Sequence, residues 1–411
     1  MKGEYADIVI AGGGLSGVLA ALALKKAHPD LRLVLIDAGE RAITARIWPC
    51  FLGDIPAADR WLVEPLFDGA WRKYEVRFPR FMRVINSSCR MITGEKIDAA
   101  LRGALGEDAL LTHEFIAGLD AGGVTLGNGR RIHARAVIDA RAGSIFPHLA
   151  GGWRVSHGKL LRFEHKHPFA HPLLMDLRVS QRDGCRFISC VPISVDTAYI
   201  CETLYSETAC SESDGIDPAE QSARIEDYCR IANWRTAEVL HEQSDVLPLV
   251  GAGDFDAFWV SGEGGVARIG AWAGLLHPFV GSEIGSAVSA ALQLAALPDP
   301  SGQAFARVSR DIAVRHWRRT GFDRMLVRLL FAASGSRRRY KLFEAIYRLD
   351  QAVVERFHAN SSTLLDRARI LLGSRVGLSR GLSAALDAGL ALSPLDEADS
   401  AHGHPARTAA S

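Results

Sequence analysis

The hydrophobic pattern at the start of the chain predicts a strand, a helix and a second strand. Residues 6–11 form a short apolar run rich in β-branched side chains, which is typical of a buried parallel strand. An alanine- and leucine-rich segment continues to about residue 26 and predicts a helix, and a second apolar run spans residues 31–37. A further run, residues 136–143, would return to the same sheet about 100 residues later. This order of elements predicts a sheet of the Rossmann type.

The pattern changes after residue 150. Between residues 151 and 250, short segments alternate apolar and polar positions, and this alternation predicts strands of an antiparallel sheet; the clearest are LLMDLRV, CRFISCVPIS and TAYICETLY. One face of such a sheet can cover a pocket. From residue 300 to 371 the pattern predicts helices instead. We therefore expect an α/β protein: a Rossmann-type domain, an inserted antiparallel-sheet domain and a C-terminal helical region.

The turn after the first strand carries the glycine pattern G-x-G-x-x-G at residues 12–17. We expect Gly12 to allow the tight turn, Gly14 to let the backbone approach a pyrophosphate, and Gly17 to let the helix pack closely on the strand. The N-terminus of the helix, at Leu15 and Ser16, would face the phosphates.

Asp37 completes this motif. It lies 20 residues after Gly17, where an acid binds the ribose hydroxyls of a dinucleotide. Because the strand, the helix, the second strand and the acid have the order and spacing of a dinucleotide-binding unit, the sequence predicts a dinucleotide site. The alternative is a Rossmann-like unit whose pocket has lost its ligand.

Two later segments favour FAD as the dinucleotide. The return strand ends in V-I-D-A-x-x-G around Asp139, a pattern common in FAD enzymes of the glutathione-reductase and hydroxylase types. The second segment runs from Gly270 to Gly274 and is followed by His277 and Gly281. Many flavin hydroxylases have Gly-Asp-Ala here, and the aspartate is missing from this chain, so a standard hydroxylase site is not expected. We expect contact with FAD at four positions beyond the glycine turn: Asp139, Gly274, His277 and Gly281. His277 could instead shape a turn.

Composition and charge exclude several classes of protein. The 48 lysine and arginine residues nearly balance the 47 aspartate and glutamate residues, which argues against general nucleic-acid binding. The seven cysteines form no C-x-x-C pair, so neither a zinc site nor a redox dithiol is predicted, and a reducing cytosol is the simplest compartment. No motif supports any other metal site. An uninterrupted run of about 18 apolar residues does not occur, so no membrane-spanning helix is predicted.

The expected helical region is basic. Residues 311–370 contain 13 lysine and arginine residues against 6 aspartate and glutamate residues. A basic amphipathic region can lie on an anionic membrane surface, although an ordinary solvated helix face has the same composition. The domain boundaries that we expect are 1–45, 86–150 and 250–300 for FAD binding, 46–85 and 151–249 for substrate binding, 301–375 for the membrane-facing helices, and 394–411 for a disordered tail.

From residue 6 to about 372, the chain resembles the bacterial FAD-dependent lycopene β-cyclases. The glycine turn, the segment 71–79 and the segment 273–278 carry part of the resemblance. The most specific matches lie in the helical tail, at residues 321–326 and 364–371, because general flavoproteins do not share these motifs.

The resemblance implies a chemistry. The family closes β-ionone rings at the ends of a long linear polyene, with reduced FAD and no net redox change, and NAD(P)H would be the reductant. A protein acid in an apolar cavity would protonate the terminal double bond, or the flavin would assist. Because the polyene dissolves in membranes, the resemblance also implies a cytoplasmic protein that is peripherally associated with the inner membrane.

The chain departs from the family where the chemistry is expected. The family motif Ile-Glu-Asp-Thr-x-Tyr becomes Ile-Cys-Glu-Thr-Leu-Tyr, so Cys201 replaces the first acid and only Glu202 remains. The motif His-x-Trp-x-x-His-x-x-Asp loses both histidines but keeps Trp48 and Asp54. A new acid, Glu283, stands at the start of a predicted helix.

Four residues are therefore candidates for catalysis. Glu283 or Glu202 would supply the acid, with Asp54 as a weaker candidate, and Trp48 could line the site of the cation. Each has a structural alternative: Glu283 as a helix N-terminal acid, Glu202 as a sheet-edge acid, and Trp48 as a core residue. Adjacent residues of a strand face opposite sides, so Glu202 cannot replace Cys201 without a bulge.

Three functions remain open at this stage. The first is an FAD-dependent cyclase acting on the end of a carotenoid or a related linear isoprenoid. The second is an FAD-dependent oxidoreductase, a monooxygenase or dehydrogenase, acting on an apolar isoprenoid-like substrate. The third is a non-catalytic protein that binds flavin or a polyene.

Overall fold

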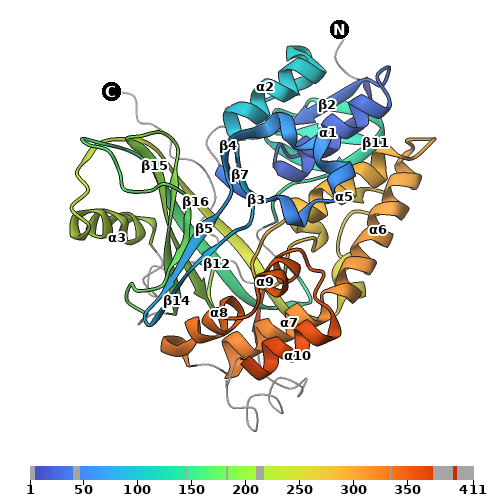
Figure 1. Cartoon of the computed structure of the whole chain (residues 1–411). Coiled ribbons are helices and arrows are strands. Elements are labelled where there is room, and N and C mark those ends of the chain that lie inside the picture. The colour runs from blue at the N-terminus through green and yellow to red at the C-terminus, as the bar shows by residue number, and fades with distance from the viewer. Residues whose placement is uncertain are drawn as a thin grey trace.

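The computed structural model describes residues 5–39, 47–143, 146–181, 184–209, 217–333, 335–373 and 392–395 (Figure 1). Two large sheets lie side by side, and helices from the C-terminal part of the chain pack beneath them. The predicted fold class, an α/β protein with a Rossmann-type domain and an antiparallel sheet, is confirmed.

The first sheet is built on the predicted parallel strands. Its strand order is β8-β2-β1-β11-β10-β9, with β17 paired to β11. The parallel strands are β1 (Tyr5–Ala11), β2 (Leu33–Ile36), β8 (Leu110–Leu111), β11 (Arg131–Asp139) and β17 (Ala267–Arg268). An antiparallel hairpin of β9 (Ile116–Asp120) and β10 (Gly123–Leu126) closes one edge.

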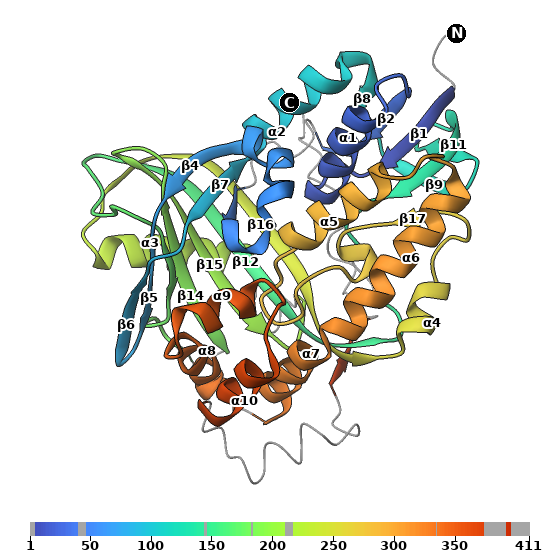
Figure 2. The same ribbon diagram turned by 45° about the vertical axis from the view of Figure 1, so that its right-hand side comes forward.

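Helices cover one face of this sheet. Figure 2 shows α1, α5 and α6 next to one another on that face. Ile8 and Ile10 of β1 pack toward these helices, while Val9 packs in a separate cluster on the other face. Both faces of β1 are buried, which explains its unbroken apolar sequence. The helices are α1 (Leu15–Ala27), α2 (Gly94–Leu105), α5 (Ile284–Ala295) and α6 (Gly302–Arg319).

The second sheet contains the predicted alternating segments. Its order is β16-β12-β15-β14-β13-β5-β6, with β18 (Ser393–Pro394) paired to β12. All the pairings are antiparallel except that of β13 with β5. The strands are β5 (Tyr74–Phe78), β6 (Phe81–Ile85), β12 (Leu149–Phe163), β13 (Leu173–Asp176), β14 (Cys185–Pro192), β15 (Thr197–Ser206) and β16 (Thr236–Gly253).

Different elements cover the two faces of the second sheet. Helix α3 (Pro218–Ile231) packs on β12 and β15 from one side. On the other side lie the C-terminal helices and a small sheet of β3 (Ile47–Phe51), β7 (Cys89–Thr93) and β4 (Phe67–Trp71). The C-terminal helices are α7 (Gly321–Arg328), a π-helical turn (Leu329–Ala333), α8 (Tyr340–Tyr347), α9 (Gln351–His358) and α10 (Leu364–Gly373); α4 (Phe255–Val260) lies elsewhere, beside α6.

The last described residues pack against the second sheet. Of the tail expected at 394–411, Pro394 pairs with β12 and Leu395 is buried, and residues 396–411 lie outside the described residues. Within the part of the chain that the structure describes, no helix is long and apolar enough to cross a membrane.

Candidate functional site

A cleft of about 880 Å³ opens at the carboxyl end of β1. It is lined by the glycine turn, the end of β2, the segment after β11 and part of β16. Gly12, Gly14, Leu15, Ser16 and Asp37 all face it, as the sequence predicts. The cap position of α1 is occupied by Gly14, which has no side chain, so it leaves the first amide groups of this helix to an anion.

Two glycines make the turn possible. Gly12 has φ = +106°, and a Cβ there would lie 2.7 Å from the Ala140 carbonyl oxygen. A Cβ at Gly17 would lie 2.1 Å from the Gly12 carbonyl oxygen. The first glycine therefore permits the turn and the second permits the close contact of helix and strand.

Of the two acids that the sequence predicts at the cofactor, Asp37 faces the cleft and Asp139 does not. Asp37 Oδ2 accepts a hydrogen bond from the Gly13 amide at 2.7 Å, and Oδ1 accepts one from the Gly39 amide at 2.8 Å, so the carboxylate is held at the cleft. Asp139 is buried and does not line the cleft. Its carboxylate binds the Arg141 guanidinium at 2.8–2.9 Å, and Arg141 is the residue that faces the cleft. Asp139 therefore positions Arg141.

Three residues of the segment 274–281 were expected at the cofactor, and the structure places them elsewhere. Gly274 and His277 do not line the cleft, and Gly281 lines the second cavity described below. The buried ring of His277 contacts the Phe357 carbonyl oxygen through Nε2 at 2.9 Å, and its Nδ1 accepts hydrogen bonds from the Phe279 and Val280 amides. His277 thus shapes the turn and ties it to α9, which is the alternative that the sequence left open.

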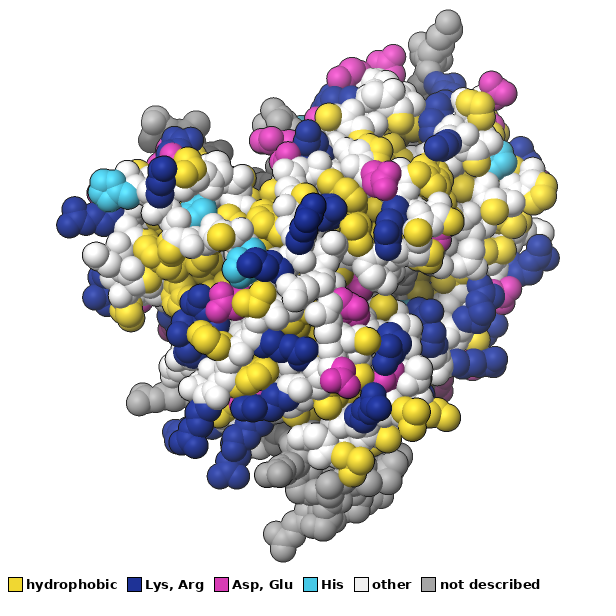
Figure 3. Space-filling view, viewed as in Figure 1, with side chains coloured by type: hydrophobic (Ala, Val, Ile, Leu, Met, Phe, Trp, Pro, Cys, Tyr) yellow, Lys and Arg dark blue, Asp and Glu magenta, His cyan; other side chains and the backbone are white. Residues whose placement is uncertain are grey.

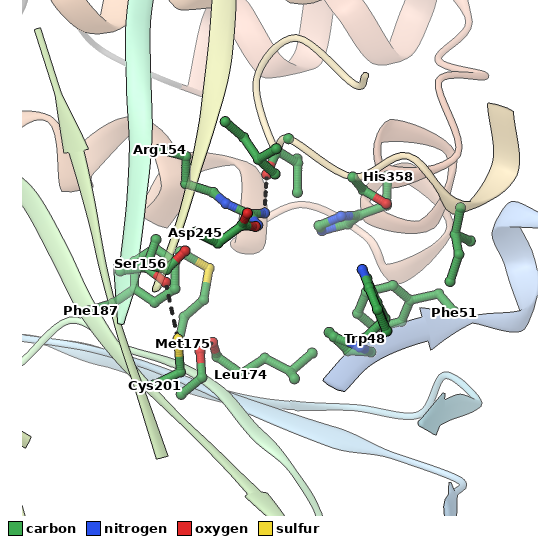
Figure 4. Close-up of a pocket in the computed structure, with 18 of the residues that line it drawn as sticks. Trp48, Phe51, Arg154, Ser156, Leu174, Met175, Phe187, Cys201, Asp245 and His358 are labelled. Carbon is green, nitrogen blue, oxygen red and sulfur yellow. Dashed lines mark hydrogen bonds and ion pairs between the residues drawn. The ribbon is translucent and has the colours of Figure 1, made fainter. Parts of the chain in front are cut away.

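A second cavity, of about 240 Å³, lies between the second sheet and the C-terminal helices (Figure 4). Figure 4 shows Arg154, Asp245 and Cys201 on one side of this cavity and Trp48 on the other. The cavity shares four lining residues with the cleft, so the two spaces adjoin along a common wall; these residues are Gln243, Asp245, Leu247 and Glu283.

Asp54 and Trp48 line this cavity, as their candidate roles require. Asp54 ends a short 3-10 helix, Leu52–Asp54, which packs against α9. Desolvation by burial, with a further contribution from the negative charge of Glu355, raises the pKa of Asp54 to about 7. A group with such a pKa can hold a proton near neutral pH and release it to a substrate.

Glu283 lies on the wall that the two cavities share. It directly precedes α5, and its Oε2 accepts a hydrogen bond from Ser16 Oγ at 3.2 Å. The N-termini of α1 and α5 therefore meet at this carboxylate, and both helix dipoles favour a negative charge there.

Glu202 lies on the face of the sheet opposite the cavity. Its carboxylate is buried between Arg186 (3.1 Å) and Arg224 (2.9 Å), on the side covered by α3. Cys201 faces the cavity instead, and burial raises the pKa of its thiol to about 11. β14, β15 and β12 keep an unbroken register here, so no bulge turns Glu202 toward the cavity. The structure gives Glu202 an ion-pair role and removes it from our candidates for catalysis.

Two polar residues of the cavity were missed in the sequence. Asp245 lies on β16 with Arg154 Nη2 3.8 Å from its Oδ2, and Arg154 Nη1 donates to the Val280 carbonyl oxygen at 3.1 Å. The signal was present, because Gln243, Asp245 and Leu247 alternate along one strand face. No group of three or more metal-ligating side chains occurs among the described residues.

The combination of a Rossmann-type sheet, a glycine turn and an antiparallel sheet beside a buried cavity defines the fold of FAD-dependent, monooxygenase-like enzymes. Among solved structures, the chain is similar to a geranylgeranyl bacteriochlorophyll reductase-like protein from Thermoplasma acidophilum (TM-score 0.56, 12% identity, 93% of this chain and 99% of that chain). It is also similar to a variant of HpxO from Klebsiella pneumoniae, solved with FAD (TM-score 0.53, 15% identity, 90% and 98% covered).

The chain belongs to the lycopene cyclase family. The sequence model of this family, described as lycopene cyclase protein, matches residues 7–380. The lycopene beta-cyclase of Pseudescherichia vulneris is 35% identical over 368 residues, which covers 89% of this chain and 93% of that protein. The lycopene beta-cyclase of Pantoea ananas is 33% identical over 373 residues, covering 91% and 95%. The resemblance in the sequence motifs is thereby confirmed.

Proposed function

We propose that this protein is an FAD-dependent cyclase that closes a ring at the end of a carotenoid or a related linear isoprenoid, with no net redox change. Membership of the lycopene cyclase family supports the reaction. The observation that carries the proposal is the position of Asp54, a carboxyl group with a raised pKa in a cavity with an aromatic wall that adjoins the cleft.

The cleft fits FAD as the cofactor. The amide groups at the N-terminus of α1 would bind the pyrophosphate, the glycine turn would leave room for it, and Asp37 would bind the ribose hydroxyls. Reduced FAD, formed with NAD(P)H as the reductant, would supply an electron-rich ring near the positive charge of the reaction.

The two carboxyl groups of the cavity would divide the acid and base roles. Asp54 would donate its proton to the terminal double bond, forming a C–H bond and a carbocation. A second double bond of the substrate would then close the ring. Glu283 would take one proton from the adjacent carbon as the new double bond forms. One proton enters and one leaves, so the substrate is isomerised. The raised pKa of Asp54 and the hydrogen bond from Ser16 to the Glu283 carboxylate support this assignment.

The rest of the cavity would protect the cation. Trp48, Phe51 and Phe357 line the same cavity as Asp54, and aromatic rings can stabilise positive charge. His358 also lines this cavity; burial lowers its pKa to about 3, so its ring stays neutral and adds no opposing charge.

Contact with a membrane surface would give the enzyme access to its substrate. Helix α10 exposes Leu364, Leu365 and Leu372. Arg337 and Arg338, just before α8, are also exposed, and Figure 3 shows basic side chains over the lower part of the molecule, around α8 and α10. Exposed leucines flanked by basic groups are suited to an anionic bilayer surface. We propose that the protein is cytoplasmic and binds the inner membrane through this surface.

Expression in a bacterial host that accumulates lycopene tests the function. We expect cyclic pigments of unchanged mass, resolved by chromatography with mass detection. The matched variants are Asp54→Asn, which should leave lycopene unconverted, and Asp59→Asn, which removes a half-buried acid of the same segment that does not line the cavity and should leave the conversion intact. Products of altered mass, formed with one NADPH oxidised per product, would instead establish an oxidoreductase. A yellow, FAD-loaded protein that leaves lycopene and related isoprenoids unchanged would contradict the proposal.

A further inference from the structure

One wall of the cavity is polar although the family acts on a hydrocarbon. The strand register places Asp245, Ser156 and Thr203 side by side on β16, β12 and β15, and all three line the cavity. The next row along the same strands continues the polar surface with Gln243, Cys201 and, on β14, Ser189. We refer to these six residues as the polar strip.

The opposite wall is mostly apolar, with Asp54 and His358 as its polar members. It is formed by Trp48, Phe51, Phe357 and Ile284, among others, and Figure 4 shows Trp48 and Phe51 across the cavity from Asp245 and Ser156. The cavity is therefore amphipathic: a substrate end placed in it touches hydrocarbon on one side and hydrogen-bonding groups on the other.

Two polar atoms, one within this strip and one beside it, have no hydrogen-bond partner among the described residues. They are Arg154 Nε, a donor, and Gln243 Oε1, an acceptor, and both atoms are buried. Other atoms of the same side chains are bound, because Arg154 Nη1 donates to the Val280 carbonyl and Gln243 Nε2 donates to Tyr199 Oη at 3.0 Å. The two side chains are thus held in place by these bonds, and the polar groups that a substrate meets in this cavity include those of the row Asp245, Ser156 and Thr203.

We propose that the substrate carries a hydroxyl group on the isoprene unit that enters the cavity, and that this hydroxyl lies on the row formed by Asp245, Ser156 and Thr203. A hydroxyl both donates and accepts, so it can donate to the Asp245 carboxylate and accept from Ser156 or Thr203. A carbonyl oxygen could not donate to the carboxylate. The inference rests on the proposed function and names the substrate class for the same site.

The test compares two linear polyenes of equal length, one a hydrocarbon and one with a hydroxyl on its last isoprene unit. Their equilibrium binding to the FAD-loaded protein is measured in detergent micelles. We expect the alcohol to bind at least about tenfold more tightly, since a site built for a hydroxyl discriminates against the analogue without it. The double variant Ser156→Ala/Thr203→Val should lower this affinity ratio severalfold, because it removes the donors to the substrate hydroxyl and keeps the Asp245 carboxylate as an acceptor. A partly misfolded sample lowers both affinities together and leaves their ratio unchanged.

Thr197→Val is the matched control, because it makes the same change on β15 outside the cavity. It should keep the preference for the alcohol. Equal binding of the two polyenes by the unmodified protein would overturn the inference and would mean that water or the cofactor satisfies the strip. An unchanged ratio in the double variant would overturn it as well.

The failure of the inference can be distinguished from the failure of the proposed function. If the hydrocarbon is bound and cyclised as well as the alcohol, the cyclase function stands and the inference falls. If the alcohol binds preferentially but neither polyene is cyclised, the substrate class stands and the cyclase function falls.

Discussion

The pKa of a single carboxyl group sets the expected pH dependence of the reaction. Burial raises the pKa of Asp54 to about 7, so the group is protonated below that pH and loses its proton above it. An acid must be protonated to act, so we expect turnover to fall as the pH rises through about 7. Asp54→Asn should reduce turnover by about a hundredfold or more. Initial rates across pH 5–9 would check this, and a flat profile in the unmodified enzyme would contradict the role of Asp54.

The same shift has a consequence for stability. The folded protein holds the Asp54 proton up to about pH 7, whereas the unfolded chain releases it near the ordinary value of 3.8. The stability that this proton contributes is therefore present at low pH and is lost as the pH rises through the folded pKa. Asp54→Asn should remove this pH dependence. Thermal melting would measure this at pH 5 and pH 8. We expect any advantage in melting temperature of the unmodified protein over the variant at pH 5 to shrink or reverse at pH 8.

We expect Glu202 to contribute to stability through its ion pairs, and not to catalysis. Its buried carboxylate lies between Arg186 and Arg224, and Glu202→Gln would leave both arginines without that charge. We expect the free energy of unfolding to fall by roughly 3–5 kcal/mol, with the turnover of the folded fraction unchanged. Glu220→Gln removes the exposed partner of Arg224 and should cost less than about 1 kcal/mol. Denaturant titration would measure both; lost turnover without lost stability would return Glu202 to catalysis.

At the scale of elements, two glycines at the start of α1 have different roles. Gly17 allows the helix to pack closely, and Gly14 lines the cleft. Gly17→Ala would place a methyl group 2.1 Å from a backbone oxygen, and backbone cannot move aside cheaply, so we expect little folded protein. A Cβ at Gly14 would meet nothing nearer than the Ala140 oxygen at 3.8 Å, yet this residue lines the cleft. Gly14→Ala should therefore keep its melting temperature without FAD and bind FAD about tenfold more weakly. Circular dichroism and FAD titration would test the pair. If the two variants had the same folded fraction and the same affinity for FAD, these separate roles of Gly17 and Gly14 would be wrong.

For the whole molecule, the exposed leucines of α10 predict where it meets a bilayer. Leu364 and Leu365 are 80% and 71% exposed. Burying each in lipid is worth about 1.5–3 kcal/mol, so Leu364→Asp/Leu365→Asp should reduce binding to vesicles of phosphatidylglycerol and phosphatidylcholine at least tenfold. Val260→Asp changes an equally exposed residue on α4 and should have no effect. Vesicle flotation would measure both, and equal flotation of the two variants would contradict a membrane surface at α10.

Local spacing in the sequence was enough to predict the first strand, the glycine turn and the helix that follows it. The roles of Gly12 and Gly17 follow from contacts within a single strand–turn–helix unit, because residues 12 and 17 lie close together in any structure of that kind. The alternation of residues along β15 likewise implied that Cys201 and Glu202 face opposite sides. Both inferences depend on short-range geometry alone.

The candidate site depended on contacts that local spacing does not encode. Helix α3 covers one face of β15, and the C-terminal helices leave the cavity on the other face. Glu202 lies on the α3 side and therefore does not line the cavity. The same packing tied His277 to α9 and left it outside the cleft. The pKa of Asp54 is raised because packing buries the group and brings Glu355 of α9 near. Asp245 lies in one row with Thr203 because β12 lies between their strands. The sequence by itself determined the elements and their alternating faces, whereas burial and long-range neighbours, which set pKa values and cavity walls, were decided by the tertiary structure.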